Sequence, residues 1–113
     1  MARTDIDGLH PVFVRQMAAL SSRNLDELME NYLPDAALLR YEGASVGTTA
    51  LRELFTGYLS LKPTLIDLTE YIETDDTIFY RAVMNLGGAP ENAFGTLVVK
   101  DGKIWRQTAG FGS

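Results

Sequence analysis

The sequence predicts an α+β domain in which three N-terminal helices pack over a mostly antiparallel sheet. Apolar residues recur at helical spacing in three segments before residue 62, and strand-like runs separated by turn residues follow from residue 65. Helices grouped before hairpin-linked strands are typical of α+β domains with separate layers. The 113 residues contain no linker and no internal repeat, so we expect a single domain over residues 1–113.

Composition excludes several classes of function. The chain has no cysteine and one histidine, His10, so thiolate and multi-histidine metal sites are impossible, and we expect neither a metal nor a cofactor. A formal net charge of −5 disfavours nucleic acid and anionic membranes as partners. No apolar run approaches the roughly 20 residues of a membrane span, and the first residues lack the apolar stretch of a signal peptide. We therefore expect a soluble cytoplasmic protein.

The first predicted helix carries one polar residue on its apolar stripe. That stripe consists of Leu9, Phe13, Met17 and Leu20, with Gln16 beside them. Asp7 is the expected N-cap, and Pro11 is tolerated because first-turn amides have no intrahelical acceptor.

Two further helices follow. Asn24 is the expected cap of the second, which Pro34 ends. Its stripe comprises Leu25, Leu28, Met29 and Tyr32. In the third, Thr48 or Thr49 is the expected cap. Its stripe comprises Leu51, Leu54, Phe55 and Tyr58.

Five strands are expected, over residues 36–42, 65–73, 78–86, 94–100 and 104–111. Residues 43–45 read as a turn and residues 87–92 as a loop. Asp101-Gly102 is the strongest hairpin signal in the chain. Strict alternation places Arg40 on one face with Ala36 and Leu38. It also places Glu70 among Ile66, Leu68 and Ile72.

Three motifs resemble those of the nuclear transport factor 2-like superfamily, in particular its SnoaL-like and ketosteroid isomerase-like branch. They are residues 23–36 (RNLDELMENYLPDA), residues 47–55 (GTTALRELF) and residues 101–104 (DGKI). The resemblance covers about residues 9–111. It implies a cone-shaped, strongly curved sheet that encloses a pocket with the three helices, commonly in a homodimer.

The resemblance also locates the residues that the isomerases use for catalysis. Their carboxylate base falls on Arg40, their oxyanion-hole tyrosine on Gln16, and their protonated aspartate near Gly95. An arginine remains protonated and cannot abstract a carbon-bound proton at neutral pH, so we do not expect isomerase chemistry.

Six residues form the predicted pocket: Gln16, Tyr32, Arg40, Phe55, Tyr58 and Glu70. Arg40 and Glu70 are the catalytic candidates. Arg40 either holds a ligand anion or pairs with Glu70 as a structural ion pair, and Glu70 becomes a general base if burial raises its pKa. For Gln16, Tyr32 and Tyr58 the alternative to ligand contact is a packing or hydrogen-bonding role in the core.

Several functions remain open at this point. One is a cofactor-independent cyclase, isomerase or dehydratase acting on a small apolar molecule with a carbonyl or carboxylate group. Another is a non-catalytic ligand-binding or dimerisation module. A third is an epoxide hydrolase-like enzyme, which needs two inward aspartates besides Arg40. Apolar residues on both sheet faces, including Phe79, Val83, Phe94 and Val98, predict a homodimer formed through the convex face.

Overall fold

The computed structural model describes residues 2–112 and contains three helices and six strands within that range. The helices are α1 (Pro11–Ser22), α2 (Leu25–Glu30) and α3 (Thr48–Leu59). The strands are β1 (Tyr32–Arg40), β2 (Gly43–Val46), β3 (Thr64–Glu73), β4 (Thr77–Leu86), β5 (Ala89–Lys100) and β6 (Lys103–Phe111).

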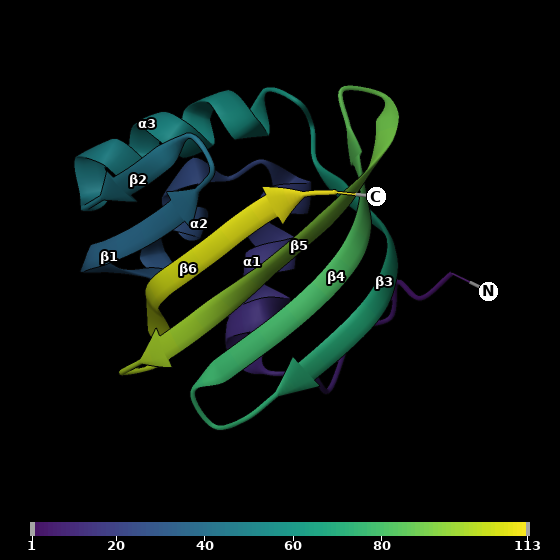
Figure 1. Ribbon diagram of the computed structural model, residues 1–113, viewed down its shortest axis with the longest axis horizontal. Helices are drawn as coiled ribbons and strands as arrows, with labels where there is room; N and C mark the ends of the chain where they lie inside the picture. The colour runs from purple at the N-terminus through teal and green to yellow at the C-terminus, as the bar shows by residue number, and fades with distance from the viewer. Residues whose placement is uncertain (1, 113) are drawn as a thin grey trace.

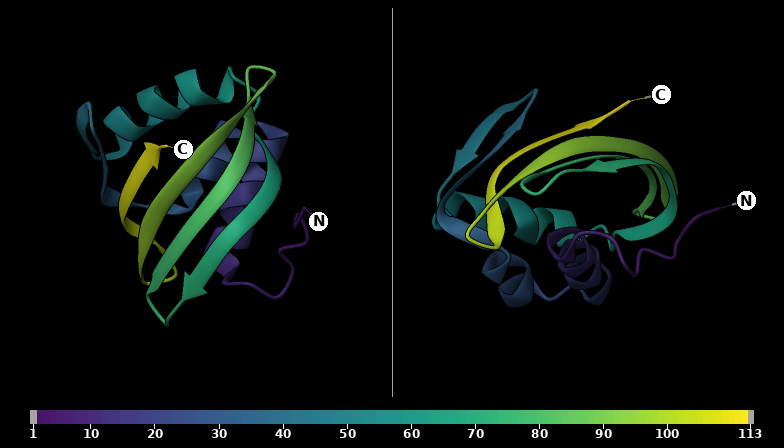
Figure 2. Two further views of the ribbon diagram at one scale, coloured as in Figure 1. Left: turned by 45° about the vertical axis from the view of Figure 1, so that its right-hand side comes forward. Right: turned by 90° about the horizontal axis from the view of Figure 1, so that it is seen from below.

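The strands form one mixed sheet with the order β2-β1-β6-β5-β4-β3. Neighbouring strands are antiparallel except for β1 and β6, which are parallel. The sheet twists and bends over the helices, with α1 and α2 behind it and α3 beside β1 and β2 (Figures 1 and 2). The predicted α+β class, with three N-terminal helices on a mostly antiparallel sheet, is therefore confirmed.

The helix caps agree with the sequence only in part. Asn24 caps α2 as predicted, because its Oδ1 accepts a hydrogen bond from the Glu27 amide at 3.1 Å. The predicted cap at Asp7 is wrong, since His10 caps α1 through Nδ1, which accepts from the Val12 amide at 3.2 Å. The predicted caps at Thr48 and Thr49 are also wrong, because α3 begins after Gly47 without a side-chain cap.

The second helix is shorter than predicted. It ends at Glu30, and Tyr32 is the first residue of β1 rather than the last residue of a helical stripe. Pairing with β6 explains this difference, because the Asn31 carbonyl accepts from the Ile104 amide at 2.8 Å and Tyr32 pairs with Ile104. Pro34 lies where the β1–β6 register shifts, so its missing N–H interrupts no regular pairing.

Turns also differ from the sequence predictions at two places. Residues 43–45 do not form a turn but belong to β2, which pairs with β1. The predicted loop over 87–92 contracts to Gly87-Gly88, whose positive φ values of 63° and 89° match a two-residue hairpin turn, so β5 begins at Ala89. The Asp101-Gly102 hairpin is confirmed, with φ values of 53° and 75°.

The core lies between the helices and the inner face of the sheet. From the helices, Phe13, Leu28 and Leu51 are fully buried. From the sheet, Ile78, Leu97 and Ile104 meet them. No helix in residues 2–112 is long and apolar enough to cross a membrane.

Candidate functional site

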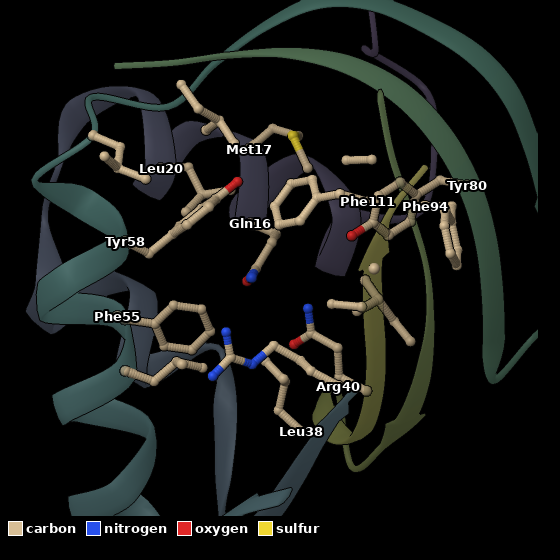
Figure 3. Close-up of a pocket in the computed structure, with 18 of the residues that line it drawn as sticks. Gln16, Met17, Leu20, Leu38, Arg40, Phe55, Tyr58, Tyr80, Phe94 and Phe111 are labelled. Carbon is tan, nitrogen blue, oxygen red and sulfur yellow. The ribbon is translucent and has the colours of Figure 1, made fainter. Parts of the chain in front are cut away.

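A cavity of about 390 Å³ opens between the helices and the inner face of the sheet. Its walls come from α1, α3 and four strands, and its apolar lining includes Met17, Leu20, Leu38, Leu54, Phe55 and Leu97 (Figure 3). Leu61 and Phe111 belong to the lining and are 42% and 51% exposed, so the cavity reaches the surface there. This volume falls within the range of roughly 300–1,000 Å³ for small-molecule sites.

Arg40 is the one cationic residue among the residues that line the cavity. It ends β1 on the face that carries Ala36 and Leu38, both buried, so strand alternation turns its side chain inward as predicted. The guanidinium extends into the cavity beside Phe55 (Figure 3). Its side chain is 35% exposed, and Nη1 lies 4.0 Å from Oε1 of Glu42 at the surface. Arg40 thus keeps access to solvent and retains donors for a ligand.

Two buried side-chain amides lie on either side of the Tyr32 hydroxyl, at the start of β1. Gln16 on α1 and Gln107 on β6 both line the cavity and are joined through the hydroxyl of Tyr32. Gln16 Nε2 donates to Tyr32 Oη at 2.8 Å, and that hydroxyl donates to Oε1 of Gln107. Tyr32 lies one layer behind the cavity wall, so its role is to hold the amides rather than to line the space.

Two tyrosine hydroxyls complete the polar lining. Tyr58 on α3 and Tyr80 on β4 both line the cavity, and no hydrogen bond joins either hydroxyl to another residue within 2–112. Burial raises the pKa of Tyr58 to about 12 and raises the pKa of Tyr80 further above its usual value. Both hydroxyls are therefore neutral at physiological pH and can donate a hydrogen bond.

The prediction that Glu70 points into the pocket is wrong. The β3–β4 register shifts between Leu65 and Asp67 and again between Leu68 and Glu70. The second bulge moves Glu70 to the outer face, where its Oε1 lies 3.7 Å from Nε of Arg81 and its side chain is 58% exposed. The predicted Arg40–Glu70 ion pair does not form, and Glu70 is no longer a catalytic candidate.

The predicted pocket residues otherwise converge. Gln16, Arg40, Phe55 and Tyr58 all line the cavity, and Tyr32 supports it from behind. The sequence analysis missed Tyr80 and Gln107. Tyr80 could have been found, because it alternates with Ile78 and Ala82 on one strand face.

The lining lacks a proton acceptor of ordinary basicity. None of the described cavity residues is Asp, Glu or His. No group of three or more His, Asp or Glu residues able to hold a metal ion occurs within residues 2–112. The cavity offers instead a cation, two amides and two neutral hydroxyls, which suits binding of oxygen acceptors on an apolar body.

Comparisons with solved structures identify the fold. A candidate ketosteroid isomerase from Kribbella flavida superposes with a TM-score of 0.79 at 15% identity, over 92% of this chain and 77% of that one. A candidate polyketide cyclase from Sinorhizobium meliloti gives 0.74 at 20% identity, over 88% and 93%. TerC, crystallised with polyporic acid, gives 0.74 at 16% identity, over 89% and 88%. No family model and no curated protein sequence matches the chain.

These likenesses define a class of protein by its architecture. The chain has the nuclear transport factor 2-like fold, also found in proteins described as ketosteroid isomerases and polyketide cyclases, as the sequence resemblance predicted. At these identities the likeness concerns the fold alone, and this fold carries many unrelated activities. What the chain does must therefore be argued from the cavity.

Proposed function

We propose that this chain binds a small, largely apolar molecule in the cavity and holds a carbonyl, carboxylate or enolate oxygen of that molecule with Arg40 and Gln107. The observation that carries the proposal is the arrangement of donors in an apolar space. Leu38 pairs with Gln107 across the parallel β1–β6 ladder, and Arg40 follows Leu38 by two residues on the same face. A charged donor and a neutral amide from adjacent strands thus lie along one wall.

The chemistry that this wall supports is stabilisation of negative charge on oxygen. A guanidinium, an amide and the Tyr80 hydroxyl can stabilise an enolate, as a cofactor-independent cyclase, isomerase or dehydratase requires. Such an enzyme also needs a base, and the lining residues supply none, so turnover would depend on a substrate with an acidic C–H or on water. The same absence favours a non-catalytic binding module, and it disfavours an epoxide hydrolase-like reaction that requires carboxylates.

The neighbours in this fold support a small-molecule ligand. One was crystallised with polyporic acid, and another is a candidate polyketide cyclase. For the present chain, apolar walls supply affinity in proportion to buried area, and the polar groups fix the orientation of the bound molecule.

A titration with 2-naphthoate tests the proposal, because this probe combines an apolar bicycle with one carboxylate. We expect saturable one-site binding that shifts the NMR signals of cavity residues. Arg40→Met should weaken it by roughly 1.5–3 kcal/mol, the range for hydrogen bonds to charged groups. Arg52→Met is the matched control, because Arg52 pairs with Asp26 at the surface and does not line the cavity. The absence of naphthoate binding to the wild type, or equal losses in both variants, would contradict the proposal.

A homodimer formed through the outer face of the sheet remains a second proposal. Ile72 is 65% exposed on β3, next to Phe79 with which it pairs on β4, and Val83 and Val98 are only partly buried on the same sheet face. Burial of such residues against a second copy would remove apolar surface from water. Sedimentation equilibrium should give twice the chain mass at micromolar concentration, and a monomer there would exclude this assembly.

A further inference from the structure

A continuous series of hydrogen bonds runs from the surface to the cavity through five side chains. In order they are Arg15, Asn31, Gln16, Tyr32 and Gln107. The last four are buried, with exposed fractions of 3% to 6%. Only Gln16 and Gln107 reach the cavity, so the rest of the series acts from behind the wall.

Arg15, at the surface end of this series, fixes which group donates and which accepts in each hydrogen bond. A guanidinium can only donate, and Arg15 Nε lies 3.0 Å from Oδ1 of Asn31, while its Nη2 donates to the Gly102 carbonyl at 2.7 Å. The Val12 carbonyl can only accept, and it lies 3.0 Å from Nδ2 of Asn31. These two contacts on opposite sides of one amide leave Asn31 a single orientation, whichever way the remaining amides are placed.

Each following hydrogen bond is then determined in turn. Asn31 Nδ2 uses its second proton to donate to Oε1 of Gln16 at 3.0 Å, so the Gln16 amide nitrogen must face Tyr32. The Tyr32 oxygen accepts there, so its one proton goes to Gln107, which must present Oε1. The NH₂ group of Gln107 is left for the cavity, and Arg15 has thereby fixed the hydrogen-bonding character of a group several residues away.

We infer that Asn31 and Tyr32 are specificity-determining positioning residues, which make the cavity select ligands by an oxygen acceptor rather than by a donor. This inference rests on the proposed function of the cavity as a ligand site and names the ligand class: apolar molecules with a ketone, quinone, carboxylate or enolate oxygen. A ligand that offers only a donor leaves the Gln107 NH₂ group without a partner in a desolvated space.

One substitution should reverse the series. In Asn31→Asp the new carboxylate can only accept, so Gln16 must turn its amide nitrogen toward that carboxylate and its oxygen toward Tyr32. The Tyr32 hydroxyl then donates to Gln16 and accepts from Gln107, and Oε1 of Gln107 faces the cavity. Tyr32→Phe breaks the series instead, and leaves Gln107 free to adopt either orientation.

The test uses two neutral bicyclic probes of similar size. 1-Indanone offers only a carbonyl acceptor, and indole offers only an N–H donor. In NMR titrations of the wild type we expect 1-indanone to bind about fivefold to tenfold more tightly than indole and to shift the Gln107 side-chain amide signals. Asn31→Asp and Tyr32→Phe should both lower this ratio, Asn31→Asp more strongly, while Arg40 still donates to the carbonyl in each variant.

Asn24→Asp is the matched control. It adds the same negative charge on the exposed cap of α2, where aspartate caps as well as asparagine, and it should leave the ratio unchanged. If Asn31→Asp does not fold, Tyr32→Phe alone decides. A wild-type ratio retained in either folded variant would overturn the inference.

Neutron diffraction from the free protein separates this inference from the proposed function. If neither probe binds the wild type, the ligand site fails, but the deuterons on Tyr32 and Gln107 still report the direction of the series. We expect a deuteron on Tyr32 Oη directed at Gln107 and an ND₂ group directed into the cavity. The opposite arrangement would overturn the inference even if both probes bind.

Discussion

The hydroxyl oxygen of Tyr80 lies 2.9 Å from the point where a Cβ atom on Gly95 would stand, so Tyr80 fills the space that Gly95 leaves open. The two residues pair directly across β4 and β5. The resemblance places the protonated aspartate of the isomerases near Gly95, and here a neutral tyrosine hydroxyl from the adjacent strand enters that region. A hydrogen-bond donor is thus present near this position, although it comes from a different residue.

Gly95 is required for space rather than for an unusual backbone angle. A Cβ there would lie 2.5 Å from the Thr108 carbonyl oxygen as well as close to Tyr80. We expect Gly95→Ala to reduce the free energy of unfolding by about 1–3 kcal/mol, the usual cost of overpacking. Gly57→Ala, in a helix where a Cβ meets nothing within 4 Å, should raise it by about 0.5–1 kcal/mol. Urea unfolding measures both, and equal stabilities of the two variants would refute this account.

Arg40 and Glu70 should be energetically independent, because they lie on opposite faces of the sheet. Arg40→Met and Glu70→Leu should each change the free energy of unfolding by no more than about 0.5 kcal/mol, as surface substitutions do. The double variant should equal their sum within about 0.3–0.5 kcal/mol. A double-mutant cycle by chemical denaturation checks this, and a coupling above about 1 kcal/mol would restore the buried ion pair that the alternation of β3 suggested.

Alkaline pH should destabilise the fold through its buried tyrosines. Burial raises the pKa of Tyr58 to about 12, against about 10 in the unfolded chain, so between these values the unfolded state has lost a proton that the folded state retains. Stability is therefore fully present below pH 10 and declines as the pH rises toward 12. Tyr58 contributes a slope of about 1.4 kcal/mol per pH unit in that window.

Tyr58→Phe measures this contribution. Between about pH 10 and 12, the unfolding free energy of the variant should decline less steeply with pH than that of the wild type. The difference in slope should be about 1.4 kcal/mol per pH unit, which corresponds to one proton per molecule. Tyr32, Tyr71 and Tyr80, whose pKa values burial also raises, remain in both proteins and contribute to the remaining slope. Identical slopes in the variant and the wild type would show that Tyr58 is not buried in the fold.

The fold and part of the cavity were predictable from the sequence because their signals are local. Helical spacing placed Gln16, Phe55 and Tyr58 correctly, and strand alternation placed Arg40. The helical periodicity around the first three is uninterrupted, and Arg40 lies beyond the β1–β6 register shift between Tyr32 and Ala37, where the pairing of β1 is regular. The turns were less predictable, since Gly87-Gly88 closes a hairpin in two residues and the sequence around it reads as a longer loop.

The misplacements of Glu70 and Tyr32 share one physical cause, which is the way each strand pairs with its neighbour in the sheet. Glu70 leaves the inner face because a bulge in the β3–β4 pair inserts Thr69 and reverses the alternation, and a bulge has no reliable signal in one strand. Tyr32 leaves the helix because β6, which follows much later in the chain, pairs with it. The role of Gln107 depends on Asn31 and Arg15, so it follows from no pattern within β6.

The wild-type protein should not isomerise a β,γ-unsaturated steroid ketone above the buffer rate. This reaction requires a group that removes a carbon-bound proton and returns it, and the resemblance places Arg40, which stays protonated, at the position of the isomerase base. The resemblance places Gln16 at the position of the oxyanion-hole tyrosine, and its amide nitrogen already donates to Tyr32. Tyr80 and Gln107 could still stabilise an enolate oxygen, but without a base no enolate forms.

Ultraviolet absorbance of the conjugated product measures the rate directly. The expected result is a rate equal to that of buffer, for the wild type and for Tyr80→Phe alike, since removing an oxyanion donor has no effect where no enolate is made. A wild-type rate well above buffer that survives repurification and falls in Tyr80→Phe would contradict the prediction. It would mean that a group outside the described lining, or water activated by Arg40 and the neutral tyrosines, acts as the base in this cavity.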